Sequence, residues 1–229
     1  MLPSSHWSKL TPVMELVVGS GATSVLDVGT GSGKFGVLCR EYLEVYPARD
    51  SVIRARDRAQ AELAGAKIRL EGIEECAEYV SALHNLVYDR LYIGDAVTVL
   101  RSLAEGAYDL VLLIDVLEHL PKDHGFSLLQ QCRRVGRTVI VTTPRRFMPQ
   151  SALFGNDLEC HRCQWSRREL RRAGARLVFR AGESYVAVLG KIPSTKYAPW
   201  SRKLKRLIRQ NMGLGKLRHS VQQAASEQP

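Results

Sequence analysis

Residues that could bind a nucleotide-like ligand and move a proton occur at four places in the sequence, each at the end of an apolar run. Carboxylates accept hydrogen bonds from hydroxyl and amino groups, glycines let a ligand approach the backbone, and a histidine can take up a proton near neutral pH. These residue types predict a site that holds a ligand rich in hydrogen-bond donors beside a group that activates a second molecule. The four places are Asp27 to Gly33, Glu74, Asp95 with Ala96, and Asp115 to His119.

The first place is a turn with three glycines at alternate positions, between a strand pattern and a helical pattern. A phosphate-binding P-loop is disfavoured, because the positions that it needs for Gly and for Ser or Thr hold Val28 and Phe35. A dinucleotide fingerprint fits only in a register that leaves Asp27 and Gly29 unexplained. Since a negative Asp27 disfavours pyrophosphate and favours an amino group, a ligand that carries an amine fits the turn better.

This turn resembles motif I of class I S-adenosylmethionine-dependent methyltransferases, in which an acid precedes Gly-x-Gly-x-Gly and the turn wraps around the methionine part of the cofactor. The resemblance implies a transferase that uses S-adenosyl-L-methionine for methylation. It assigns cofactor binding in this chain to Asp27, Gly29, Thr30, Gly31 and Gly33.

The other three places resemble later motifs of the same family. Glu74 ends a predicted strand, and the resemblance implies that it accepts hydrogen bonds from both ribose hydroxyls of the cofactor. It follows the glycines at a greater distance than in a compact unit, which leaves Glu71 and Glu75 as alternatives. Gly94-Asp95-Ala96 resembles the adenine-binding turn. Asp115-Val116-Leu117-Glu118-His119 resembles motif IV and adds Asp115 to the expected cofactor site.

Glu118 and His119 are the residues expected to take part in catalysis. Methyl transfer requires alignment of the acceptor, exclusion of water and, where the acceptor carries a proton, a base to remove it. His119 is the natural base, since the pKa of a histidine starts near neutrality. Equally, both side chains could do no more than start a helix and shape the pocket.

A divalent metal is a further interpretation of the same region. Asp115, Glu118, His119 and His161 offer two carboxylates and two imidazoles. Their spacing is similar to that in ubiquinone-pathway O-methyltransferases and in enzymes that 2′-O-methylate the 3′ end of small RNAs. Those families favour Glu where this chain has Asp115, and many metal-free methyltransferases share the Asp-Val-Leu-Glu-His sequence. The first expectation is therefore that the site binds no metal.

The acceptor is expected to be an oxygen or amine of a small molecule or metabolite. No Asn-Pro-Pro-Tyr or Asp-Pro-Pro-Tyr run follows residue 115, which disfavours enzymes that methylate DNA bases or glutamine, and no Pro-Cys suggests cytosine C5 chemistry. Cys160-His161-Arg162-Cys163 lacks the second ligand pair of a zinc finger. The irregular stretch 147–159 resembles a lid facing the acceptor.

The elements that position these residues alternate strand and helix patterns, which predicts an α/β fold. The resemblance specifies a doubly wound, mostly parallel seven-stranded sheet with helices on both faces, in a Rossmann-like domain over residues 1–191. In open sheets of this kind ligands bind beyond the carboxyl ends of the strands, where all four places fall. The expected strands are 25–28, 68–74, 91–96 with its loop, 108–115, 137–144, 176–180 and 184–191.

Composition places the chain among globular proteins, with 45% hydrophobic and 24% charged residues in a total of 229. No apolar stretch is long enough to span a membrane, and the first residues lack a secretory signal pattern. Five cysteines, an odd number, fit a reducing cytoplasmic location better than a disulfide scaffold.

The formal charge of +10 belongs mainly to the end of the chain, where residues 191–229 hold nine Lys or Arg and one acid. We expect residues 192–229 to form a basic amphipathic tail that could contact RNA, an anionic membrane surface or an acidic partner. RNA methylation, with Arg145-Arg146 and Arg167-Arg168 extending the basic track, and a non-catalytic binding module are the alternative functions. The oligomeric state is not indicated.

Overall fold

Seven strands form a single sheet in the computed structural model, which describes residues 5–45, 67–153 and 155–193. The sheet order is β3-β2-β1-β4-β5-β7-β6. Strands β1 to β5 are parallel, and β7 runs antiparallel to both β5 and β6. The strands are β1 (Ser24–Val28), β2 (Arg69–Glu74), β3 (Arg90–Ile93), β4 (Tyr108–Ile114), β5 (Gly136–Pro144), β6 (Ala175–Ala181) and β7 (Ser184–Gly190).

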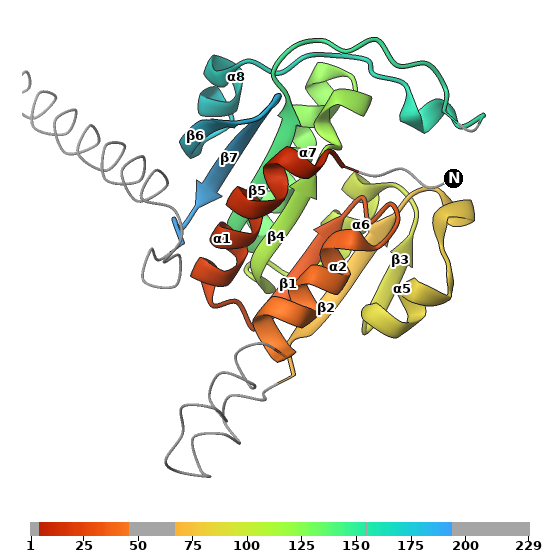
Figure 1. Ribbon diagram of the computed structural model, residues 1–229, viewed down its shortest axis with the longest axis vertical. Coiled ribbons are helices and arrows are strands. Elements are labelled where there is room, and N and C mark those ends of the chain that lie inside the picture. Colours follow the sequence, from red (N-terminus) through yellow and green to blue (C-terminus); the bar gives the residue numbers. More distant parts are fainter. Residues whose placement is uncertain (1–4, 46–66, 154, 194–229) are drawn as a thin grey trace, which may run out of the picture.

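Helices cover both faces of this sheet (Figure 1). One face packs against α1 (Leu10–Ser20), α2 (Lys34–Cys39) and α5 (Ala82–Val87). The other face packs against α6 (Ala96–Ser102), α7 (Lys122–Val135) and α8 (Arg167–Arg172). The expected doubly wound seven-stranded fold is therefore confirmed. No helix among the described residues is long and apolar enough to cross a bilayer.

Alternate residues of the central strands supply the two hydrophobic cores. In β4, Leu110 and Leu112 contribute to the core beneath α1, while Val111 and Leu113 contribute to the core beneath α7. A strand covered on both faces must be apolar throughout, which explains the continuous apolar run that predicted it.

Short helical turns connect the longer elements. They are η1 (Trp7–Lys9), the π-helical turn η2 (Arg40–Val45), η3 (Ala77–Tyr79), η4 (Leu117–His119) and η5 (Asp157–Glu159). The helical spacing of Cys76, Tyr79, Val80 and Leu83 predicts one helix over 75–86. That prediction is wrong in detail, because the chain is extended at Val80 and Ser81, and Ser81 with His84 forms the capping box that starts α5. Ser166 followed three residues later by Glu169 predicts a capping box, and the structure confirms it at the start of α8.

Two features expected from the sequence lie outside the described residues. The stretch 46–67 is rich in charge and alanine and is interpreted as an insertion before β2, and the structure describes only its Lys67. Of the basic tail 192–229 it describes only residues 192 and 193. The structure describes 5–45, 67–153 and most of the residues that follow up to 191, and these include all the predicted site residues.

Candidate active site

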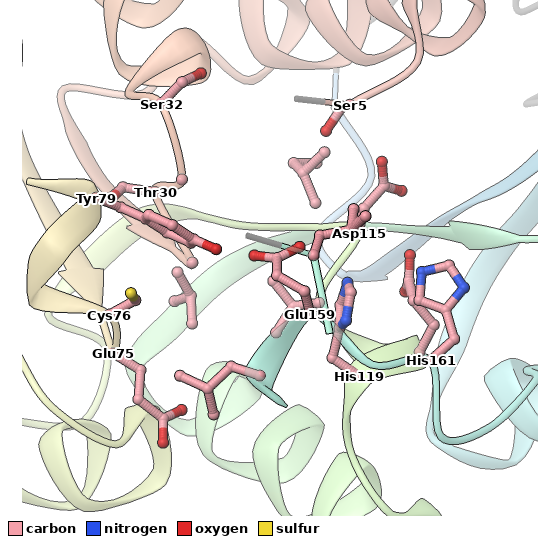
Figure 2. Close-up of a pocket in the computed structure, with 18 of the residues that line it drawn as sticks. Ser5, Thr30, Ser32, Glu75, Cys76, Tyr79, Asp115, His119, Glu159 and His161 are labelled. Atoms are coloured by element: carbon pink, nitrogen blue, oxygen red, sulfur yellow. The ribbon is translucent and has the colours of Figure 1, made fainter. Parts of the chain in front are cut away.

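A cavity of about 490 Å³ lies beyond the carboxyl ends of β1, β2 and β4. The glycine turn, the end of β2 and the η4 turn line it, the N-terminal residues Ser5, His6 and Lys9 lie on one side, and residues of the 148–161 segment lie on another. Figure 1 shows that segment running along the carboxyl edge of the sheet, and Figure 2 shows Thr30, Tyr79 and Cys76 across the cavity from His119 and His161. The topology thus brings distant motifs to one place.

The glycine turn has the backbone that only glycine adopts without strain. Gly29, Gly31 and Gly33 have φ of 76°, 53° and 78°. A Cβ on Gly29 would lie 2.6 Å from Cγ2 of Val116, the residue that follows Asp115. Of the five predicted residues in this motif, Gly29, Thr30 and Gly31 line the cavity, whereas Asp27 and Gly33 do not.

Glu74 fastens the glycine turn to the end of β2. Its Oε2 accepts hydrogen bonds from the Gly31 amide at 2.7 Å and the Thr30 hydroxyl at 3.1 Å, and its Oε1 accepts from the Cys76 amide at 3.0 Å. The side chain is buried yet lines the cavity. Among the three alternative acids, Glu74 and Glu75 reach the cavity. Glu71 is instead held by two tyrosine hydroxyls and Arg69.

Asp27 lies outside the cavity lining, with 2% of its side chain exposed. The Tyr88 hydroxyl donates to its Oδ2 at 2.7 Å. Burial raises the pKa of Asp27 to about 7, although the Tyr88 hydrogen bond opposes the rise and the charge of Glu74 adds to it. Asp27 therefore supports the turn from within the core.

We expect this buried carboxyl to make stability fall with rising pH. The folded state holds the proton until about pH 7, while the unfolded chain releases it near the ordinary value of 3.8. Between those values the unfolded state binds fewer protons, so the free energy of unfolding decreases, by up to about 4 kcal/mol for this group. Asp27→Asn should remove that part of the slope in urea denaturation measured from pH 4 to 8. The exposed Asp123→Asn is the control, and an unchanged slope in Asp27→Asn would contradict the prediction.

Asp95 caps α6. Its Oδ2 accepts from the Thr98 amide at 2.7 Å, and the pKa of its carboxyl is lowered, since hydrogen bonds with Thr98 outweigh the effect of burial. Ala96, the next residue, lines the cavity, while Asp95 lies outside its lining. At the predicted adenine-binding turn, Ala96 rather than the Asp95 carboxylate therefore lines the cavity.

Asp115 forms a partly buried ion pair with Lys9, a residue that the sequence did not single out. Its other carboxylate oxygen accepts from the Thr142 hydroxyl at 2.7 Å, and its backbone has φ of 55°, rare outside glycine. Lys9 is 3% exposed and lines the cavity. The apolar spacing from Trp7 to Val18 predicts a helix beside the first strand, and the ion pair ties the start of this segment to the end of β4.

Glu118 and His119 lie at the cavity with His161. Burial, and then the charge of Asp115, raise the pKa of Glu118 to about 8. The pKa of His119 departs from its expected start near neutrality, because burial and then the neighbouring His161 lower it to about 4. At neutral pH, Glu118 is therefore largely protonated and His119 is neutral.

The 148–161 segment lines the cavity where a lid was expected. The Asn156 amide donates to the Tyr79 hydroxyl at 3.0 Å, and the Gln150 amide donates to the Glu159 carbonyl at 2.7 Å. Tyr79 was predicted only as an apolar helix residue, and no local pattern marks it as part of the site. Met148, Leu153 and Leu158 give this wall an apolar character.

The basic track proposed for RNA is partly occupied within the protein. Arg145 pairs with Glu183 at 3.1 Å, and Arg167 donates to the Val178 carbonyl at 3.0 Å. Cys160 and Cys163 are free thiols, and neither belongs to a cluster of potential metal ligands among the described residues.

A sequence model described as a methyltransferase domain matches residues 11–180 of this chain. The chain belongs to this methyltransferase family. Comparison with curated proteins gives no match. The match to the methyltransferase domain confirms the family and fold expected from the sequence, and the enzyme is an S-adenosylmethionine-dependent methyltransferase.

Solved structures with the same fold include two described as SAM-dependent methyltransferases. The protein from Archaeoglobus fulgidus has a TM-score of 0.54 at 15% identity, over 80% of this chain and 92% of its own. The protein from Aquifex aeolicus has a TM-score of 0.50 at 16% identity, over the same shares. PH0226 from Pyrococcus horikoshii OT3 scores 0.50 at 14% identity, over 75% of this chain and 82% of its own.

The methyltransferase's glycine turn fits the cofactor of this family. Gly29 and Gly31 leave backbone without side chains at the cavity, and the space that a Cβ of Gly29 would need is taken by Val116. Carboxyl groups surround the turn at Glu74, Glu75 and Asp115, which suits a ligand with an amino group and vicinal hydroxyls.

Proposed function

We propose that this methyltransferase transfers a methyl group from S-adenosyl-L-methionine to an oxygen or amine of a small molecule. The observation that carries the proposal is a cavity that joins the glycine turn to Glu118 and His119. Its volume of about 490 Å³ lies within the range of small-molecule sites.

The cofactor would lie over Gly29, Thr30 and Gly31, with Glu74 and Ala96 beside it. Asp115 also lines the cavity, whereas Asp27, Gly33 and Asp95 lie outside its lining and would act through the backbone and side chains that they hold in place. The sulfonium supplies an electrophilic methyl group, so the protein's part is to align the acceptor and exclude water.

The acceptor would lie between η4 and the 148–161 segment. Neutral His119 can accept a proton or a hydrogen bond from a hydroxyl or amine there, and the apolar wall of Met148, Leu153 and Leu158 can hold the rest of the molecule. Five free cysteines, three of them buried, fit the cytoplasmic location that we propose.

A transfer assay with tritium-labelled S-adenosylmethionine and cell extract tests the proposal. Extract separated into metabolite, protein and RNA fractions should give label in the metabolite fraction. Label confined to RNA or protein would overturn the small-molecule proposal, and failure to bind S-adenosylhomocysteine in calorimetry would overturn cofactor binding itself.

His119→Ala should lower methyl transfer into that fraction by about 100-fold or more, the usual effect of a lost acid or base. S-adenosylhomocysteine affinity should stay unchanged in calorimetry. His124→Ala is the matched control, because His124 is an exposed histidine of α7 that lies outside the cavity lining. Equal transfer rates in the two variants would refute a role for His119 in catalysis.

A further inference from the structure

Two buried polar atoms at the acceptor side of the cavity have no hydrogen-bond partner among the described residues. They are Oε2 of Glu118 and Nδ1 of His119. Glu118 is only 3% exposed, so water cannot readily replace a missing donor. Buried polar atoms are nearly always paired, because an unpaired one loses its hydration without compensation. Both atoms can offer a lone pair to a cation, Glu118 once its carboxyl has released its proton, so one bound cation would satisfy the two together.

His161 completes a set of three potential ligands with these two residues. One potential ligand atom from each residue, a carboxylate oxygen and two ring nitrogens, lies within 4.8 Å of the others. The two imidazole rings meet edge to face with centroids 4.8 Å apart, and Figure 2 shows them side by side. Ligands around a bound transition metal lie about 3 to 4 Å apart, so movements of about 1 Å would close the set.

The orientation of His161 is fixed from behind by the main chain. Its Nδ1 lies 2.6 Å from the Met148 carbonyl oxygen. A carbonyl can only accept, so in the neutral ring Nδ1 carries the hydrogen and Nε2 keeps its lone pair. Histidines that bind metals are oriented in this way, by donating the hydrogen of the other ring nitrogen to a carbonyl or carboxylate.

Asp115 does not belong to this set, although the sequence offered it as a fourth ligand. One of its carboxylate oxygens pairs with Lys9 and the other accepts from the Thr142 hydroxyl. The Lys9 ion pair therefore sets Asp115 apart from the three-residue cluster.

We propose that Glu118, His119 and His161 bind a divalent transition-metal cation through one carboxylate and two imidazoles. Such a set suits Zn²⁺, Fe²⁺, Co²⁺ or Mn²⁺ and leaves coordination positions open on the cavity side. A bound divalent cation lowers the pKa of a hydroxyl that coordinates it. The acceptor atom in the cavity is then an oxygen rather than an amine, a consequence that rests on the proposed function.

Cobalt binding to the full-length protein tests the site without needing the acceptor. After dialysis against a chelator and then buffer, Co²⁺ is titrated while its visible absorption and the heat of binding are recorded. Wild-type protein should bind one Co²⁺ with a spectrum of mixed nitrogen and oxygen ligands. Glu118→Gln and His161→Ala should each weaken binding by at least about tenfold, whereas the exposed His124→Ala should bind as wild type does.

Calorimetry with S-adenosylhomocysteine on the same samples separates this proposal from the proposed function. Binding of S-adenosylhomocysteine without uptake of Co²⁺ would overturn the metal site and leave the methyltransferase intact. Equal Co²⁺ affinity in wild-type, Glu118→Gln and His161→Ala proteins would also overturn it, since the ion would then bind elsewhere. Thermal unfolding of each variant confirms that a lost site does not reflect a lost fold.

Discussion

Trp165→Ala should lower the free energy of unfolding by about 3 to 5 kcal/mol, the range for removing a large aromatic side chain from a core. Trp165 is fully buried beneath α7. A Cβ on Gly125 would lie 2.5 Å from its Cζ2, so α7 admits the indole only where it has a glycine. The Phe126 ring packs against it at 4.8 Å between centroids.

Trp165 also holds the active site. Its Nε1 donates to the Leu117 carbonyl at 3.1 Å, and Leu117 begins the η4 turn that carries Glu118 and His119. Three residues before Trp165 in the chain, the backbone amide of Arg162 donates to the Glu118 carbonyl at 2.7 Å. The indole therefore links the chain that brings His161 to the turn that holds its neighbours, and its loss should lower methyl transfer as well as stability.

Two companion variants give this prediction its control. Trp7→Ala removes the same side chain from a site 74% exposed and should change stability by about 0.5 kcal/mol or less. Trp165→Phe keeps most of the ring, and its cost should reflect mainly the lost hydrogen bond, about 1 to 2 kcal/mol. If Trp165→Ala and Trp7→Ala unfold at the same urea concentration, Trp165 does not anchor the core.

The sequence predicts the fold and the positions of the motifs because both depend on local patterns. Apolar runs mark strands, and a parallel sheet brings their carboxyl ends to one edge, so the residues after Val28, Ile73 and Ile114 meet without further information. The glycine turn is equally local, because its positive φ angles require the residue type that reveals them.

The roles within the site depend on contacts that no local pattern carries. Lys9 and Asp115 are 106 residues apart, and nothing near either predicts their ion pair. Whether an acid at the end of β2 faces the ligand or fastens the turn depends on which amides lie near it, and in Glu74 both carboxylate oxygens accept from the protein.

Burial explains why the titration of the site could not be predicted either. From the sequence alone, a glutamate and a histidine are expected to have their ordinary pKa values. In the folded protein, desolvation is the largest cause of the pKa shifts of Glu118 and His119. This desolvation depends on residues 160–165, which follow the 147–159 stretch and cover the η4 turn.

Gly29→Ala should weaken S-adenosylhomocysteine binding by about 10- to 100-fold in calorimetry. Two costs combine at this position. A non-glycine residue at φ of 76° is strained by about 1 to 2 kcal/mol, and the added Cβ would lie 2.6 Å from Cγ2 of Val116. Because both Gly29 and Val116 line the cavity, relief of the collision by either one alters the cofactor's side of it.

Gly106→Ala separates strain from collision. Gly106 has a φ of 64°, and its Cβ would meet nothing within 4 Å. Gly106 also lies outside the cavity lining, so its replacement should reduce stability by a similar strain and leave cofactor affinity as in wild type. Loss of affinity in Gly106→Ala would show that general destabilisation, rather than the shape of the turn, controls binding.

The double variant Gly29→Ala with Val116→Ala isolates the collision itself. Val116→Ala removes the Cγ2 atom that the new Cβ would meet, so the second substitution should restore most of the affinity lost in the first. An interaction free energy of about 1 kcal/mol or more in this double-mutant cycle would assign the loss to the contact between the two residues. If the two effects simply add, the glycine is required for its backbone conformation alone, and the close approach of the η4 turn to the glycine turn has no part in holding the cofactor.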